Sequence, residues 1–106
     1  MLFRSLPVEV KNVFYRIAQE GLNNIFKHAE ASQVWFRFTC TAEEVTLSIS
    51  DDGQGFARKD VPAGHLGLEI MSERAETIGA ELTLVSYPGE GTTLRLNWKS
   101  AWNRLK

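Results

Sequence analysis

The chain has 106 residues, of which 43% are hydrophobic and 24% charged, and these values are typical of one soluble globular domain. Its formal net charge of −1 argues against nucleic acid or an anionic membrane surface as a partner. The single cysteine, Cys40, excludes a disulfide framework and a thiolate zinc site. Without a signal peptide or an apolar run of about 20 residues, the sequence predicts a cytoplasmic location with no direct membrane contact. This prediction includes the cytoplasmic part of a larger membrane-bound protein.

The first half of the chain predicts a helix followed by a hairpin. Residues 7–29 form the helix, because apolar side chains recur at three- and four-residue spacing. These are Phe14, Ala18, Gly21, Leu22, Ile25 and Ala29. Residues 33–40 and 45–50 alternate apolar and polar side chains, which predicts two antiparallel strands joined by a polar turn. The first strand has Val34, Phe36, Phe38 and Cys40 on one side, and Trp35, Arg37 and Thr39 on the other.

The second half repeats this order. Residues 53–65 are rich in glycine and charge and predict a mobile loop. Residues 66–78 predict a helix with Ile70, Met71, Ala75 and Ile78 inward and Gly79 as its C-terminal cap. Residues 81–86 and 92–98 predict two further strands. Since the strands come as hairpins, the sequence predicts an α+β fold, a two-layer sandwich with a mixed or antiparallel sheet and helices on one face.

The most informative segment is Asp51-Asp52-Gly53-Gln54-Gly55-Phe56, directly after the second strand. A carboxylate at the end of a buried strand can accept a hydrogen bond from a ligand amine. The glycines let the backbone turn and approach that ligand closely. Asp-Gly pairs are also ordinary turn formers, so a segment of this kind, taken alone, is more often a simple turn than a binding site.

A polar stripe on the first helix is a second candidate. Glu20, Asn24 and Lys27 are spaced i, i+4 and i+7, nearly opposite the apolar stripe, with His28 at the edge. Such a stripe is commonly a solvated face. It also has the groups that a triphosphate site needs: an amide oxygen for Mg²⁺, a carboxylate that can orient water, and a cation for phosphate oxygens.

Two further segments contain glycines in suggestive places. Gly64-His65-Leu66-Gly67 precedes the second helix, whose first N–H groups favour a bound phosphate. Gly89-Glu90-Gly91-Thr92 precedes the last strand, where a threonine hydroxyl can share a water with a nucleobase. A hinged connection and a hairpin turn are the alternative interpretations. The sequence has no P-loop and no dinucleotide-binding fingerprint.

Together, these four segments resemble, in order and spacing, the motifs of bacterial sensor histidine kinases. Residues 19–29 resemble the N-box, and residues 51–55 resemble the D-x-G-x-G box. Residues 64–75 resemble the lid-to-helix segment of the nitrate-sensor-like subfamily, and residues 89–92 the closing G-x-G-T. The resemblance covers roughly residues 6–98 and implies a single domain with the Bergerat fold of the GHKL ATPases, with a mixed, mostly antiparallel sheet, followed by a tail at residues 99–106.

The resemblance also implies roles for individual residues. Asp51 would bind the adenine amino group, supported by Thr92 through a water, with Gly53, Gly55 and Phe56 bordering the base. Asn24 would ligate Mg²⁺, and Lys27 and His28 would lie near the phosphates, while Glu20 would assist catalysis with Asn24 and Lys27. Residues 56–66 would form the ATP lid. The triphosphate would be covered by the last three residues of this lid, Gly64, His65 and Leu66, and by the adjacent Gly67.

The resemblance further implies partners. In this family the phosphoacceptor histidine lies in a dimerising helical hairpin that precedes the domain and is absent from this sequence, and a response regulator acts downstream. The chain is therefore expected to act as an excised ATP-binding catalytic domain. Two alternatives remain open: another ATPase of the superfamily, such as an anti-sigma-type serine kinase, and an interaction domain with a decayed nucleotide site. Two departures are Asp52 in place of a common Asn, and Gly21 in place of the usual Ala, which costs a helix about 0.5–1 kcal/mol.

Overall fold

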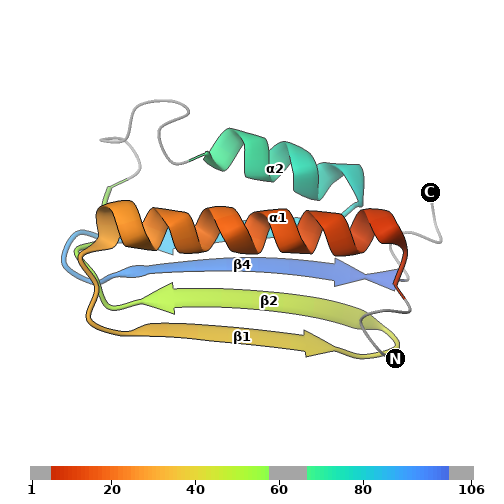
Figure 1. Cartoon of the computed structure of the whole chain (residues 1–106), viewed down its shortest axis with the longest axis horizontal. Coiled ribbons are helices and arrows are strands. Elements are labelled where there is room, and N and C mark those ends of the chain that lie inside the picture. Colours follow the sequence, from red (N-terminus) through yellow and green to blue (C-terminus); the bar gives the residue numbers. More distant parts are fainter. Residues whose placement is uncertain (1–5, 58–66, 101–106) are drawn as a thin grey trace.

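The computed structural model describes residues 6–57 and 67–100, apart from the side chains of His28 and Ala29. In chain order its elements are α1 (Val8–Asn24), η2 (Ile25–Ala29), β1 (Val34–Cys40), β2 (Glu44–Asp51), α2 (Leu68–Thr77), β3 (Glu81–Ser86) and β4 (Thr92–Lys99). The strands form one sheet in the order β1-β2-β4-β3, and each of these pairings is antiparallel. Figure 1 shows both helices on the same face of the sheet, which confirms the predicted two-layer α+β fold.

The core lies between the sheet and the helices. Along β2, Val45, Leu47 and Ile49 are buried, while the residues between them are partly exposed, as expected for a strand with one covered face. The helix α1 buries Val10, Val13, Phe14, Ile17 and Gly21. Of the predicted stripe, Phe14 and Gly21 are in this buried set, while Ala18, Leu22 and Ile25 lie at its border and are only partly buried. No helix in the described ranges has the length and apolar character needed to span a membrane.

The end of the first helix differs from the prediction in its geometry. The helix reaches Ala29 as expected, but its last turn, η2, is π-helical, and Glu30 ends it in a left-handed conformation with φ 51°. A π turn holds more residues than an α turn, so side-chain spacing after Asn24 no longer follows the α-helical period. The predicted i, i+4, i+7 alignment of Lys27 with Glu20 and Asn24 therefore does not hold.

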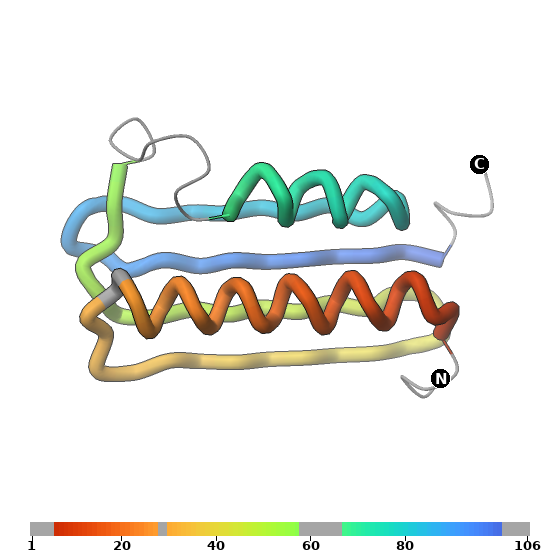
Figure 2. Tube along the Cα trace, turned by 45° about the horizontal axis from the view of Figure 1, so that its top comes forward, coloured from red at the N-terminus to blue at the C-terminus, as the bar shows by residue number. Residues whose placement is uncertain are grey.

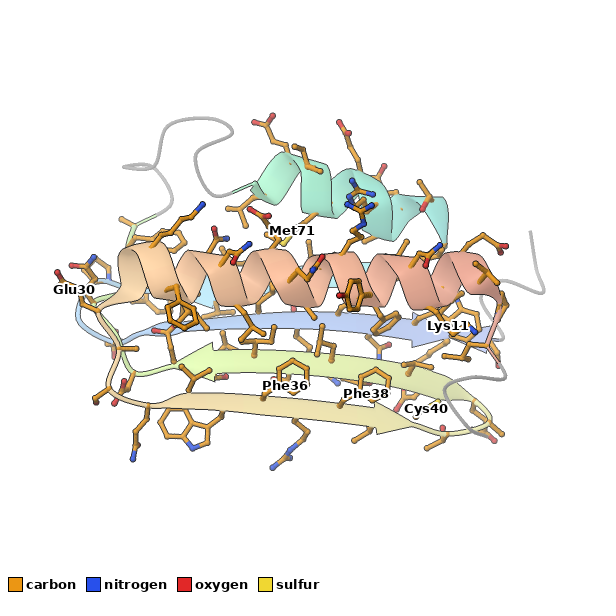
Figure 3. All side chains as sticks on the ribbon, viewed as in Figure 1. Lys11, Glu30, Phe36, Phe38, Cys40 and Met71 are labelled. Carbon is orange, nitrogen blue, oxygen red and sulfur yellow. The ribbon has the colours of Figure 1, made fainter. Side chains whose placement is uncertain are left out.

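The edge strand β1 is largely exposed, including the side that faces the helices. Phe36 and Phe38 face the helices, yet 52% and 37% of their surfaces remain exposed. Figure 3 shows both rings lying beside α1, which packs mainly over the neighbouring strand β2. Phe38 meets Phe14 edge to face, with ring centroids 6.1 Å apart. An edge strand has sheet on one side only, so its inward side chains receive less cover.

The second helix ends as predicted, but one inward residue was assigned wrongly. The Ala80 N–H donates to the Ala75 carbonyl and the Gly79 N–H to the Glu76 carbonyl, which is the Schellman pattern with Gly79 at φ 69°. Met71, Ala75 and Ile78 are buried, whereas Ile70 is 58% exposed. Ile70 lies about 100° around the helix from Met71, which turns it away from the sheet.

Candidate functional site

One pocket lies between the two helices and the sheet, at the end where the segment after β2 begins. Figure 2 shows that the end of α1, residues 52–57 and the turn between β3 and β4 gather at this end. The space in the pocket is about 540 Å³, including the part open to solvent. It is lined by Gly21, Asn24, Ile25, Ile49, Asp51, Gly55, Phe56, Leu68, Met71, Leu84, Thr92 and Leu94.

Asp51 is the most unusual residue in this pocket. It ends β2, is only 6% exposed, and is the one charged side chain that the described residues bury. Its Oδ1 accepts a hydrogen bond from the Gly53 N–H at 2.8 Å. Burying a carboxylate costs free energy unless hydrogen-bond donors surround it. One backbone donor satisfies only part of its acceptor capacity, so the side chain is suited to a further donor within the pocket.

The adjacent Asp52 faces a different environment. Its carboxylate accepts hydrogen bonds from the Ser32 N–H and hydroxyl at 2.9 and 2.7 Å and from the Gln33 N–H at 2.9 Å. These bonds, the Gln33 N–H foremost, hold the pKa of the Asp52 carboxyl below its ordinary value. Asp52 does not line the pocket. It joins the start of β1 to the end of β2.

Two glycines allow the backbone segments around Asp51 to approach one another. A Cβ at Gly55, whose φ is 62°, would overlap the Tyr87 carbonyl oxygen. A Cβ at Gly91, whose φ is 77°, would overlap the carbonyl oxygen of Asp51 itself. Both positions therefore need glycine for backbone packing as well as for conformation. The two glycines thus allow the turn of residues 87–91 to pack directly against residues 51–55, which include the Asp51 carboxylate.

Ser86 was not among the predicted site residues, although it organises this region. Its Oγ accepts the Phe56 N–H at 2.9 Å and lies 3.0 Å from the Gly91 carbonyl oxygen, to which it can donate. It also lies 2.8 Å from Thr92 Oγ1. A weak signal was present in the sequence, because Ser86 continues the inward positions of Leu82 and Leu84 where another apolar residue was expected.

The other predicted residues are distributed unevenly. Asn24 is half-buried and lines the pocket, as do Gly55, Phe56 and Thr92. Gly53 and Gly67 are not among the lining residues, and neither are Glu20 and Lys27. Lys27 is exposed. The side chain of His28 and all of Gly64, His65 and Leu66 lie outside the described residues.

The position of the Glu20 and Asn24 stripe was predicted wrongly. A Cβ built on Gly67 would lie 2.7 Å from Glu20 Oε1, so the Glu20 carboxylate sits against the start of α2. Asn24 adjoins Gly21 and Ile25 at the pocket. The stripe therefore borders α2 and the core, and does not lie opposite the core. A carboxylate at this position interacts favourably with the positive end of the α2 dipole.

Most of the remaining residues that line the pocket are apolar. From the sequence, these residues were either predicted to belong to the core or given no role. Gly21 explains part of the shape: a Cβ there would lie 3.0 Å from Leu94 Cδ2 and 3.1 Å from Ile49 Cδ1. The glycine thus allows α1 to approach the sheet closely at the pocket. Within residues 6–57 and 67–100 there is no group of three or more His, Cys, Asp or Glu that could hold a metal ion.

Comparisons with known proteins agree on one family. A family model described as histidine kinase-, DNA gyrase B-, and HSP90-like ATPase matches residues 9–101. The chain is 36% identical over 87 residues to the sensor histidine kinase LiaS of Bacillus subtilis, covering 82% of this chain and 24% of LiaS. It is 35% identical over 98 residues to the nitrate/nitrite sensor protein NarQ of Escherichia coli, covering 92% of this chain and 17% of NarQ. The chain thus spans about a quarter or less of these relatives.

Solved structures are similar over most of the chain. The blue-light activated histidine kinase EL346 of Erythrobacter litoralis has a TM-score of 0.76 at 25% identity, covering 95% of this chain and 34% of that protein. Full-length ShkA, solved in complex with AMPPNP, has a TM-score of 0.68 at 21% identity, covering 82% of this chain and 21% of ShkA. The second likeness concerns the fold alone.

Proposed function

The chain belongs to the family of histidine kinase-, DNA gyrase B- and HSP90-like ATPases, and from this we propose that it is the ATP-binding catalytic domain of a two-component sensor histidine kinase. The γ-phosphoryl group of ATP would be transferred to a histidine on a separate helical dimerisation domain, and from there to a response regulator. The catalytic unit would run from residue 6 to Lys99, one residue beyond the predicted end at 98, because β4 ends at Lys99, and the residues after it would form the tail. The observation that carries this proposal is the buried Asp51 carboxylate in an apolar pocket that it shares with Asn24.

The pocket is suited to a purine base in its shape and polarity. Ile49, Met71 and Leu94 present apolar surface that can contact the faces of a planar ring. The Asp51 carboxylate is acceptor-only when ionised, so it favours the exocyclic amino group of adenine over the carbonyl oxygen of guanine. Thr92 pairs directly with Asp51 across β2 and β4, which supports the proposal that its hydroxyl shares a water with the base.

The phosphates would extend from this pocket toward the end of α1 and the start of α2. Asn24 would offer its amide oxygen to Mg²⁺, whose other ligands would be phosphate oxygens and water. Bound there, the ion would neutralise charge on the phosphates. Lys27 would approach the phosphates only through its long side chain, because its backbone lies in the exposed η2 turn. His28, Gly64, His65, Leu66 and Gly67 remain candidates for phosphate contacts.

Catalysis by such a domain depends on positioning and on charge stabilisation more than on acid–base chemistry. Asn24 and Lys27 would orient and neutralise the phosphates. Glu20 would act through position, because its carboxylate sits against Gly67 at the start of α2, next to the segment that would close over the triphosphate. We propose that it orients water or the approaching imidazole.

Calorimetric titration of Mg-ATP and Mg-GTP into the chain and its variants tests the adenine site. We expect a micromolar-to-millimolar dissociation constant for Mg-ATP, clearly weaker binding of Mg-GTP, and a loss of about tenfold or more for Asp51→Asn. Asp52→Asn is the matched control, because it changes the adjacent carboxylate, which faces Ser32 and Gln33, and we expect it to retain the ATP affinity. Equal affinities for ATP and GTP, or equal losses in the two variants, would contradict the role of Asp51.

The reaction itself needs a second experiment. Transfer of ³²P from γ-labelled ATP to a supplied helical phosphoacceptor domain, and the acid lability of the product, distinguish a histidine kinase from a serine kinase of the same superfamily. Asn24→Ala should abolish transfer and remove the Mg²⁺-dependent part of ATP binding, while the Mg²⁺-independent binding of the base persists. Acid-stable label on a serine would contradict the proposal.

A further inference from the structure

The sheet face opposite the helices carries an ordered set of exposed side chains. In register across β1, β2 and β4, Trp35 pairs with Ser50, which pairs with Thr93. In the same way, Arg37 pairs with Ser48, which pairs with Arg95. These side chains point away from the core, because the residues between them on β2 are buried. We call this surface the outer face. It contains a shallow depression lined by Trp35, Arg37, Thr39, Glu44, Thr46, Ser48, Ser50 and Arg95.

The two arginines of the outer face are placed to share one anionic group. Arg37 and Arg95 lie on either side of Ser48 in a single row, and adjacent strands are about 4.8 Å apart, so their backbones are separated by about 10 Å. Neither guanidinium has a hydrogen bond or an ion pair with any residue in the described part of the chain. A carboxylate above Ser48 could therefore accept hydrogen bonds from both arginines and from the serine hydroxyl.

The adjacent row across the sheet has an apolar side chain at each end and hydroxyl side chains between them. Trp35 is 54% exposed, and Val85, at the other end of the row formed with Ser50 and Thr93, is 53% exposed. Tryptophan and arginine are the residue types that most often dominate the binding energy of protein interfaces. Exposed tryptophan beside unpaired arginine is therefore typical of a surface that contacts another protein.

We propose that the outer face binds a polypeptide that presents a carboxylate side chain next to an apolar one. The carboxylate would lie between Arg37 and Arg95, and the apolar side chain would pack on Trp35. Charge complementarity favours this partner over nucleic acid, because Glu44 lies in the same depression and interrupts the positive charge that a phosphate backbone would follow. The inference goes beyond ATP binding and concerns the opposite side of the sheet.

A partner bound at this location could influence the pocket through the strands that the two surfaces share. Ser50 and Thr93, whose hydroxyl oxygens are 3.0 Å apart, are the immediate chain neighbours of Asp51 and Thr92. A partner that packs on Trp35 and extends over Ser50 and Thr93 would therefore contact β2, which ends at the buried Asp51, and β4, which begins at Thr92.

Binding can be tested by two-dimensional ¹H–¹⁵N NMR of the whole chain. The probe is a short synthetic peptide in which glutamate and leucine are two positions apart and separated by serine, so that an extended backbone presents both groups on one face. We expect chemical-shift changes at the Trp35 indole N–H and at the amides of Arg37, Ser48 and Arg95. Arg37→Glu and Arg95→Glu should each weaken binding about fivefold or more, and added salt should weaken it further.

The controls separate charge, fold and class of partner. Arg74→Glu changes an exposed arginine on α2 and should leave peptide binding unchanged. The spectra themselves report whether each variant remains folded, and Arg37→Gln and Arg95→Gln replace any charge-reversed variant that does not. Equal binding of the peptide with glutamine in place of glutamate, or no shift on the outer face, would overturn the proposal. Tighter binding of single-stranded oligothymidylate through the same residues would overturn it in favour of nucleic acid.

Discussion

Replacing Gly91 by alanine tests whether the turn between β3 and β4 positions Asp51. Gly91 has φ 77°, and a Cβ there would overlap the Asp51 carbonyl oxygen, with the Asp52 Cα a further 3.2 Å contact. Gly89 in the same turn has φ 80°, but a Cβ there would meet nothing within 4 Å. Gly89→Ala is therefore a matched control, since it introduces the same left-handed strain without the steric overlap.

The two substitutions differ in a predictable free energy. A left-handed conformation costs an alanine about 1–2 kcal/mol, and the loss of unfolded-state freedom returns about 0.4–1 kcal/mol of this. Both variants share these contributions. Only in Gly91→Ala does the new Cβ overlap backbone atoms of Asp51, so that the turn and Asp51 must move apart. Overpacking of this kind typically costs about 1–3 kcal/mol. We therefore expect Gly91→Ala to be less stable than Gly89→Ala by about 1–3 kcal/mol.

Urea denaturation, followed by the intrinsic tryptophan fluorescence to which the buried Trp98 contributes, measures both free energies of unfolding. Calorimetry with Mg-ATP then measures whether displacement of the Asp51 backbone weakens binding in Gly91→Ala and leaves it intact in Gly89→Ala. Equal free energies of unfolding for the two variants would refute the close approach of residue 91 to Asp51. A destabilised Gly91→Ala with unchanged ATP affinity would instead separate the turn from the function of Asp51.

Three other substitutions test the surroundings of the site. Ser86→Ala removes the acceptor of the Phe56 N–H, so it should cost about 1–2 kcal/mol of stability in urea denaturation and weaken ATP binding; unchanged amide exchange at Phe56 would contradict this. Asp52→Asn should unfold at a lower urea concentration than the unchanged chain at pH 7. The pKa of the Asp52 carboxyl is lowered from 3.8 in the folded protein, so the ionised carboxylate stabilises the fold above that pH. This stabilisation is lost as the pH falls through the folded-state pKa. A stability difference between the two chains that persists at lower pH would exclude the ionised carboxylate as its cause. Trp98→Phe removes the donor to the buried Ile78 carbonyl and should cost about 1–3 kcal/mol in thermal or urea unfolding, whereas a neutral result would show that water replaces the bond.

The two neighbouring carboxylates show how far a motif can be interpreted without coordinates. Asp51 and Asp52 are chemically identical and adjacent, yet one is buried in the pocket and the other accepts three hydrogen bonds at the surface. The alternation of β2 predicts that successive residues face opposite sides of the sheet. It does not predict that Ser32 and Gln33, about twenty positions earlier, supply the donors for Asp52.

Sequence alone was sufficient for the features that depend on local periodicity and on recognisable motifs. The order of elements, the hairpins and the cap at Gly79 follow from spacing and residue type, because these reflect backbone geometry within a few residues. The ATPase family was indicated by the resemblance of four segments to known motifs. Only the tertiary structure revealed the role of Ser86, the exposure of Ile70 and Phe36, and the placement of Glu20 against α2. The same is true of the row in which Arg37 and Arg95 lie on either side of Ser48. Each of these depends on which distant segments pack together and on how far the helices extend over the sheet, and hydrophobic patterning does not specify either of them.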